Sequence, residues 1–264
     1  MKLPVVLAVI ASLAAAAHAN PRALPFTYTT DTLAPGKVEI EQYADLDPVK
    51  AGEGHDYFAT EFLTEIEIGI ADRLELGLYF TLAPHPDSNT YGTVANVPGE
   101  GSGLKQRLRY IFADPGAWPI DVGVYGELTE IDNEVELEGK ILLQKRFGNL
   151  RIAANLSNEY EFYFTKQRDY VLNPSLGVTY EISPKFHLGI DSWMQGEYPL
   201  NPKPATRTFS LGPEIYVGPA YMINFGRLWW SLGAYARVTD TGHDLVAGEP
   251  YGKVYFRSMI GYDL

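Results

Sequence analysis

Hydrophobic and polar residues alternate along most of this chain with a period of two, which is the pattern of a β-strand that has one apolar and one polar face. Between residues 56 and 70 the even positions are apolar or threonine, whereas the odd positions include Glu61, Glu65 and Glu67. A second alternating run covers residues 74–82 after a short turn. The two runs together predict a β-hairpin.

The same unit recurs to the end of the chain, and with a first strand at residues 37–46 the alternation predicts twelve strands. Tight turns are expected at five places, near Asp72, Pro115, Gly148, Pro184 and Gly226. Six longer, polar or proline-containing connections alternate with these turns, near residues 48–56, 84–101, 130–133, 158–170, 196–206 and 239–250.

An even number of strands, with short turns at one end and long loops at the other, is typical of a transmembrane β-barrel. Each strand supplies about 9–11 alternating residues, enough to cross a bilayer at a tilt of about 45°. We therefore predict an all-β fold, a single transmembrane antiparallel up-and-down β-barrel of about 12 strands with short periplasmic turns and longer extracellular loops. A soluble β-sandwich also alternates, but it would seldom need five similar turns.

The first 19 residues have the composition of a secretory signal. Lys2 gives a positive start, residues 3–17 carry no charge, and residues 17–19 form a small-x-small cleavage site. We expect three regions: a signal peptide at residues 1–19, a periplasmic N-terminal arm at 20–36 and an outer-membrane β-barrel at 37–264. The pattern leaves open whether the region 20–36 forms a plug, an arm or a disordered tail.

Composition excludes several classes of function. The chain of 264 residues has no cysteine, which rules out disulfides, thiolate metal sites and a cysteine nucleophile. Its formal net charge of −12 argues against a nucleic-acid partner, because no basic patch is available to displace phosphate counterions.

Two stretches carry a family resemblance, residues 25–43 (PFTYTTDTLAPGKVEIEQY) and residues 69–77 (GIADRLELG). They resemble a Gram-negative outer-membrane barrel family classed as a domain of unknown function, related to a group named for the phenol meta-cleavage degradation pathway. The resemblance implies location in the cell outer membrane and a barrel fold rather than an activity, because neither stretch is catalytic. Many such barrels end in phenylalanine as an assembly signal, whereas this chain ends in Leu264. Membrane lipid and the barrel-assembly machinery are the partners implied.

If the apolar positions face lipid, the alternate positions face the lumen. We expect the selectivity of that lumen to depend on eight charged residues, which are Glu65, Glu67, Glu75, Lys105, Arg107, Arg109, Glu136 and Glu138. The basic residues lie on a strand between acidic neighbours, as a charged interior needs, because an unpaired charge there is costly. Side chains fill the interior of an eight-stranded barrel, whereas a porin of sixteen to eighteen strands encloses a wide channel. Twelve strands lie between these sizes, so the lumen could be either a narrow pore or filled by salt-bridged side chains.

The function predicted is a narrow passive channel for small solutes, in which an acid-rich lumen favours cations and neutral molecules over polyanions. The alternative is a closed structural or surface-binding barrel whose extracellular loops contact a partner. A third hypothesis, an outer-membrane lipid hydrolase, rests on His85, Ser88 and Asn89, which are crowded into one loop without the separate base and orienting group that such catalysis uses. We therefore predict no enzyme activity, no catalytic residue, no metal and no cofactor.

Overall fold

The computed structural model describes residues 20–51, 55–82, 94–95, 103–131, 134–201, 213–239 and 253–264. Fourteen strands are present in these ranges. The same ranges contain no helix that is long and apolar enough to cross a membrane. The strands are β1 (Val38–Ala51), β2 (His55–Ala71), β3 (Leu74–Leu82), β4 (Val94–Ala95), β5 (Gly103–Ile111), β6 (Asp121–Ile131), β7 (Glu134–Phe147), β8 (Leu150–Tyr163), β9 (Arg168–Leu172), β10 (Ser175–Ser183), β11 (Phe186–Pro199), β12 (Glu214–Asn224), β13 (Leu228–Arg237) and β14 (Val254–Asp263).

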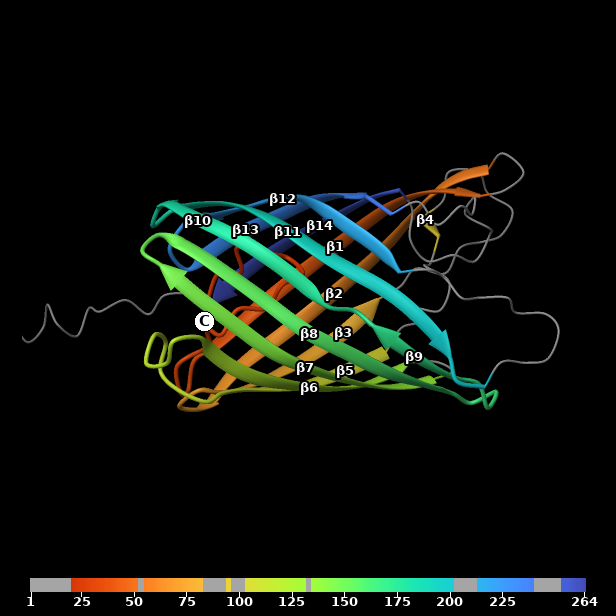
Figure 1. The fold of residues 1–264 in the computed structure, drawn as a ribbon, viewed down its shortest axis with the longest axis horizontal. Coiled ribbons are helices and arrows are strands. Elements are labelled where there is room, and N and C mark those ends of the chain that lie inside the picture. The colour runs from red at the N-terminus through yellow and green to blue at the C-terminus, as the bar shows by residue number, and fades with distance from the viewer. Residues whose placement is uncertain are drawn as a thin grey trace, which may run out of the picture.

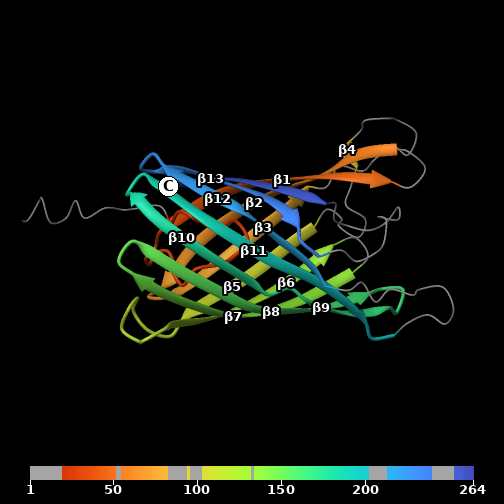
Figure 2. The ribbon, with the colours of Figure 1, turned by 45° about the horizontal axis from the view of Figure 1, so that its top comes forward.

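The strands close into a barrel because β1 pairs with both β2 and β14. β9 and β10 each lie between β8 and β11, so they occupy a single position in the wall. The wall is interrupted there at Pro174, which has no N–H to donate to a neighbouring strand. β4 pairs in parallel with β2 and lies outside the antiparallel wall. The result is the predicted closed barrel of twelve antiparallel strands, tilted around a common axis (Figures 1 and 2).

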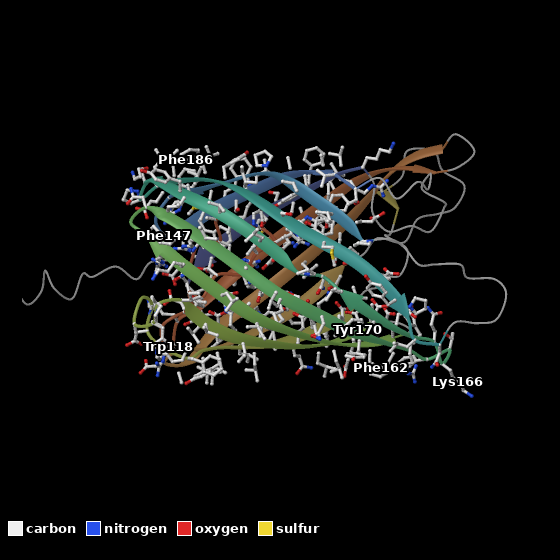
Figure 3. The ribbon with its side chains drawn as sticks, viewed as in Figure 1. Trp118, Phe147, Phe162, Lys166, Tyr170 and Phe186 are labelled. Atoms are coloured by element: carbon white, nitrogen blue, oxygen red, sulfur yellow. The ribbon has the colours of Figure 1, made fainter. Side chains whose placement is uncertain are left out.

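The alternation along the sequence separates the side chains that face the lumen from those on the outer surface of the barrel. On β5 the side chain of Leu108 is 52% exposed on the outer surface, whereas Arg107 and Arg109 beside it are 0% and 1% exposed in the interior. Aromatic side chains lie at both ends of the barrel, with Trp118 and Phe147 near the short turns and Phe162 toward the other end (Figure 3). An apolar outer band with aromatic ends is the surface that a bilayer requires.

The lengths of several connections differ from the prediction, and two of them differ most clearly. The turn expected near Pro115 is a longer connection over residues 112–120, where Pro115 and Pro119 lack the N–H groups that a strand ladder needs. Conversely, the long connection expected over residues 158–170 is mostly strand, because β8 continues to Tyr163 and β9 begins at Arg168. Polar residues do not end a strand as long as its neighbour continues to pair with it.

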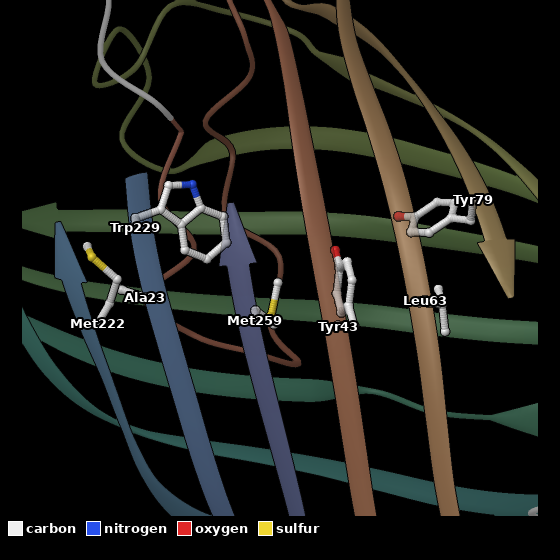
Figure 4. Close-up of a cluster of buried hydrophobic side chains, with 7 residues drawn as sticks. All are labelled: Ala23, Tyr43, Leu63, Tyr79, Met222, Trp229 and Met259. Carbon is white, nitrogen blue, oxygen red and sulfur yellow. The ribbon is translucent and has the colours of Figure 1, made fainter. Parts of the chain in front are cut away.

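Residues 20–33 lie inside the barrel, whereas residues 34–36 are exposed and lead to β1. They enter the half of the lumen next to the short turns and fold back to β1, seen as the red segment in Figure 1. Leu24 is fully buried, and Ala23 packs in a cluster of interior side chains from several strands (Figure 4), which are Tyr43, Leu63, Tyr79, Met222, Trp229 and Met259. Of the possibilities that the sequence leaves open, the structure has a plug, and we call residues 20–36 the inserted segment. The predicted signal peptide lies outside the described residues.

Candidate functional site

Arg107 is the centre of a buried network of charges in the lumen. It extends from β5 toward three carboxylates on β2 and β3, and all four side chains are 0–1% exposed. Its Nη1 lies 2.8 Å from Oε1 of Glu75, its Nε lies 3.1 Å from Oε1 of Glu65, and its Nη2 contacts Glu65 and Glu67. Arg109 adds a contact of 2.5 Å to Glu75. A buried guanidinium is stable here because several acceptors surround it.

Gly77 on β3 leaves the space that this network occupies. A Cβ at this position would lie 2.5 Å from Oε1 of Glu65 and 2.6 Å from Nε of Arg107. Both distances are far below van der Waals contact, so the close approach of the two charged groups depends on a residue without a side chain.

The inserted segment extends the network with a cation of its own. Arg22 donates from Nη1 to the hydroxyl of Tyr43 at 2.5 Å and lies 3.7 Å from the carboxylate of Glu41. The Tyr43 hydroxyl is also within hydrogen-bonding distance of Glu41 and Glu65, at 2.5 and 2.7 Å. The guanidinium of Arg22 stacks 4.0 Å above the ring of Tyr28, a further residue of the segment. The segment is therefore joined to the wall by charge as well as by packing.

An aromatic cluster holds the middle of the inserted segment. Phe26 stacks on Trp193 with ring centroids 4.5 Å apart, and the guanidinium of Arg257 lies 4.0 Å from the Phe26 ring on another side. The backbone N–H of Phe26 donates to Oδ2 of Asp191 at 2.8 Å, and Arg257 is itself paired with Asp45 at 2.8 Å. The wall thus contacts both the side chain and the backbone of the segment.

Asp31 anchors the returning half of the segment near the short turns. Its carboxylate lies 2.7 Å from Arg151 and also contacts Arg146. Burial raises the pKa of the Asp31 carboxyl, but the guanidinium groups of Arg151 and Arg146 outweigh burial and hold this pKa below its usual value. Asp31 is therefore ionised at neutral pH.

On the other side of the inserted segment, toward the long loops, the lumen widens into a cavity of about 260 Å³. We call this space the acidic vestibule. Arg22, Phe26 and Tyr28 are among its lining residues and form its floor. Within the described part of the chain, four basic residues line it, namely Arg22, Arg257, Lys105 and Lys140. Eight glutamates line it as well, namely Glu61, Glu127, Glu134, Glu136, Glu138, Glu159, Glu161 and Glu197.

Several vestibule glutamates lie directly opposite one another on neighbouring strands. Glu136 is paired in register with Glu161, and Glu138 with Glu159. Like charges in such positions repel and destabilise a sheet. Lys140 relieves part of this repulsion through a contact of 2.9 Å to Glu138. The arrangement therefore costs stability and brings acidic side chains together in one space.

The eight residues selected from the sequence all face the lumen, but they fall into two groups. Glu65, Glu67, Glu75, Arg107 and Arg109 form the buried network beside the inserted segment. Lys105, Glu136 and Glu138 line the acidic vestibule.

Sequence reasoning missed Arg22, Phe26 and Asp31, because residues 20–36 have no periodicity to indicate that they enter the lumen. It also left Glu159 and Glu161 out of the site. Their alternation with Tyr160 and Phe162 could have placed them on an inward face. The hydrolase candidates His85, Ser88 and Asn89 lie outside the described residues.

The fold and its charged lumen define a class of protein, the closed outer-membrane β-barrel. The NanC porin has the same fold with a TM-score of 0.58 at 10% identity, over 86% of this chain and 100% of that chain. The KdgM porin, solved in complex with disordered oligogalacturonate, has a TM-score of 0.56 at 7% identity, over 86% of this chain and 99% of that chain. At identities this low, the comparisons show a shared fold alone.

The chain belongs to a family of unknown function, DUF6662, whose model matches residues 16–249. This finding confirms the expected membership of a barrel family without an assigned activity. The relation to the phenol meta-pathway group stays a prediction. No curated protein matches the sequence.

Proposed function

We propose that this protein is an outer-membrane channel for small cationic or neutral solutes, which enter through the acidic vestibule and meet the inserted segment as a gate. In this proposal the short turns and the inserted segment are periplasmic. The single observation that carries it is the excess of glutamates around the vestibule, where eight carboxylates face four basic side chains among the residues that the structure describes. Such a surface raises the local concentration of cations and repels polyanions.

The destabilising like-charge pairs of the vestibule support a role other than stabilising the barrel. A lumen that only needed filling would be more stable with opposite charges in register, as Arg109 and Glu75 are on β5 and β3. Glu136 opposite Glu161 and Glu138 opposite Glu159 have the reverse arrangement. We infer that these pairs serve the electric field of the vestibule rather than the stability of the sheet, because like charges in register repel.

Passage requires the inserted segment to move. Its residues form the vestibule floor, and Leu24 and Thr27 are 0% and 1% exposed between that floor and the short turns. Asp31, Phe26 and Arg22 each hold it to a different part of the wall. The resting state of the proposed channel is therefore closed.

Conductance in a planar bilayer tests this function. Refolded protein without residues 1–19 is expected to show brief openings with a reversal potential biased toward cations in a salt gradient. The double variant Glu159→Gln, Glu161→Gln should lose most of that bias. Glu130→Gln is the matched control, because Glu130 is an exposed glutamate on the outer face at the same end of the barrel. Anion preference, or an unchanged bias in the double variant, would refute the proposal.

The second candidate is a closed structural or surface-binding barrel, and the same inserted segment favours it. The double variant Phe26→Ala, Asp31→Asn discriminates between the two, because it removes an aromatic contact and a charged contact of the segment while leaving all the glutamates of the vestibule in place. Conducting steps from this variant support a gated channel. If a folded, inserted variant stays silent, the barrel is closed and its long loops are the place to search for partners.

A further inference from the structure

A group of carboxylates next to the inserted segment lacks sufficient positive charge. It consists of side chains on β1, β2, β3 and β14, each 0–1% exposed, namely Glu39, Glu41, Glu65, Glu67, Glu75 and Asp263. Three guanidinium groups contact this set, those of Arg22, Arg107 and Arg109. The backbone nitrogen of Asn20 donates to Oε2 of Glu39 at 3.0 Å. If the predicted cleavage after residue 19 makes this nitrogen an ammonium, six carboxylates still face only four cations in the described ranges.

The excess negative charge is concentrated at one place. Glu39 lies directly opposite Glu67 on β2 and directly opposite Asp263 on β14. The contacts of Arg107 do not satisfy every carboxylate oxygen here. Three buried oxygens have no hydrogen-bond partner among the described residues, namely Oε1 of Glu41, Oε2 of Glu67 and Oδ2 of Asp263. An unpaired buried carboxylate oxygen is costly, and three of them on neighbouring strands point to a missing cation.

The chemistry of the ligands suits one kind of ion. One carboxylate oxygen from each of Glu39, Glu41 and Glu67 can be chosen so that all three lie within 4.8 Å of one another. Ca²⁺ binds oxygen at about 2.3–2.6 Å, so two of its ligands lie at most about 5 Å apart. Mg²⁺ usually keeps several waters and is bound through one or two carboxylates, whereas Ca²⁺ accepts several carboxylates in a flexible geometry. Ligand sets made of carboxylates alone select such hard cations over zinc or copper.

We propose that Glu39, Glu41 and Glu67 bind a divalent cation, best matched by Ca²⁺, with Asp263 as a neighbouring carboxylate. The ion supplies the two positive charges that the corner lacks and joins β1, β2 and β14, the strands through which the barrel closes. Because the ligands are buried behind the inserted segment, the ion binds as the barrel closes. This site is independent of the proposed channel function and would equally stabilise a closed barrel.

The structure provides a spectroscopic probe for the site. Trp229 donates from its indole nitrogen to Oε1 of Glu39 at 2.9 Å, so its ring lies beside the proposed ion. Tb³⁺ replaces Ca²⁺ at oxygen sites and emits when a nearby tryptophan is excited. Protein without residues 1–19, refolded with Tb³⁺, is expected to show this emission, to lose it on addition of excess Ca²⁺, and to lose most of it in Trp229→Phe.

Variants of the ligands complete the test. Removal of an outer-shell partner already lowers metal affinity by about 10–100-fold, so Glu41→Gln and Glu67→Gln should each weaken Ca²⁺ binding at least as much. Glu130→Gln, on the outer face, should bind as the wild type does. Refolding in Ca²⁺ rather than in chelator should raise the Tm of the wild type, since an ion that binds only the folded state stabilises it.

Three results would overturn the proposal. The first is a Tm that is the same in Ca²⁺ and in chelator. The second is Tb³⁺ emission that survives in Trp229→Phe at its full intensity. The third is loss of binding in Glu159→Gln rather than in Glu67→Gln, which would place the ion in the vestibule. If the ligand variants fail to refold, the first two measurements decide without them, because they need only the wild type and Trp229→Phe.

Discussion

The backbone N–H of Leu33 donates to Oε2 of Glu75 at 2.8 Å, which joins the inserted segment to the buried charge network. Oε1 of the same carboxylate accepts from Arg107 and Arg109. Leu33 and Glu75 belong to the two stretches that carry the family resemblance, residues 25–43 and 69–77. The two stretches therefore meet in space, where the segment docks on β2 and β3.

The first prediction concerns Gly69, where the segment leaves the lumen. The N–H of Gly36 donates to the carbonyl oxygen of Gly69 at 2.8 Å, and a Cβ at Gly69 would lie 2.2 Å from the carbonyl oxygen of Ala34. Backbone atoms cannot rotate away, so Gly69→Ala should lower the free energy of unfolding by about 1–3 kcal/mol. Urea unfolding measures this change. Gly126→Ala is the control, since a Cβ there meets nothing within 4 Å, and equal effects of the two variants would contradict the prediction.

The second prediction concerns Arg107. Its loss leaves Glu65 and Glu67 buried beside each other without the guanidinium that contacts both. Breaking a buried ion pair by removing one partner costs about 3–5 kcal/mol, and Arg107→Gln should destabilise the barrel by at least that amount. The measurement is the temperature at which the folded band disappears on a heat-modifiability gel. Lys145→Gln is the comparison, because Lys145 is only partly buried. A small effect at Arg107 would mean that the carboxylates are protonated.

The third prediction is a dependence of docking on acid pH. Asp31 has a pKa below its usual value, so its pairing with Arg151 and Arg146 stabilises docking fully above the unfolded-state pKa of about 3.9. This contribution is lost as the pH falls through the lowered pKa of the folded state. Protease cleavage within residues 20–36 should therefore stay constant from pH 7 to 5 and rise below about pH 4.

The matched variant for this pH dependence is Asp31→Asn. It should be cleaved faster than the wild type at pH 7, and its cleavage should rise less on acidification. Equal cleavage of the variant and the wild type at pH 7 would show that Asp31 does not hold the segment.

The fourth prediction concerns Phe26 and the aromatic cluster. Phe26→Ala removes the ring between Trp193 and the guanidinium of Arg257. Truncation of a fully buried phenylalanine costs about 3–5 kcal/mol, and the partly buried Phe26 should cost less. The loss falls on docking of the segment rather than on the strand ladder. Tryptophan fluorescence should therefore shift to longer wavelength while the β-sheet circular dichroism is kept. Loss of both signals together would mean that the segment and the barrel fold as one unit.

The sequence by itself determined the strands and their two faces. Alternation is a local property, so Leu108 pointing outward between Arg107 and Arg109 followed from the period of two. It also predicted the lumen position of Glu65, Glu75 and Glu136. It misjudged where strands end, because pairing with a neighbour, and not polarity, decides that.

Only the tertiary structure decided which charges meet. Glu39 lies opposite Glu67 and Asp263 because closure brings β1 beside both β2 and β14, and such pairings depend on register between strands far apart in the chain. The place of residues 20–36 was decided in the same way. A segment without periodicity gives no sign of which side chains point into the lumen. Residues 20–33 lie there because the segment contacts side chains of the wall, among them Glu75, Asp191 and Arg151.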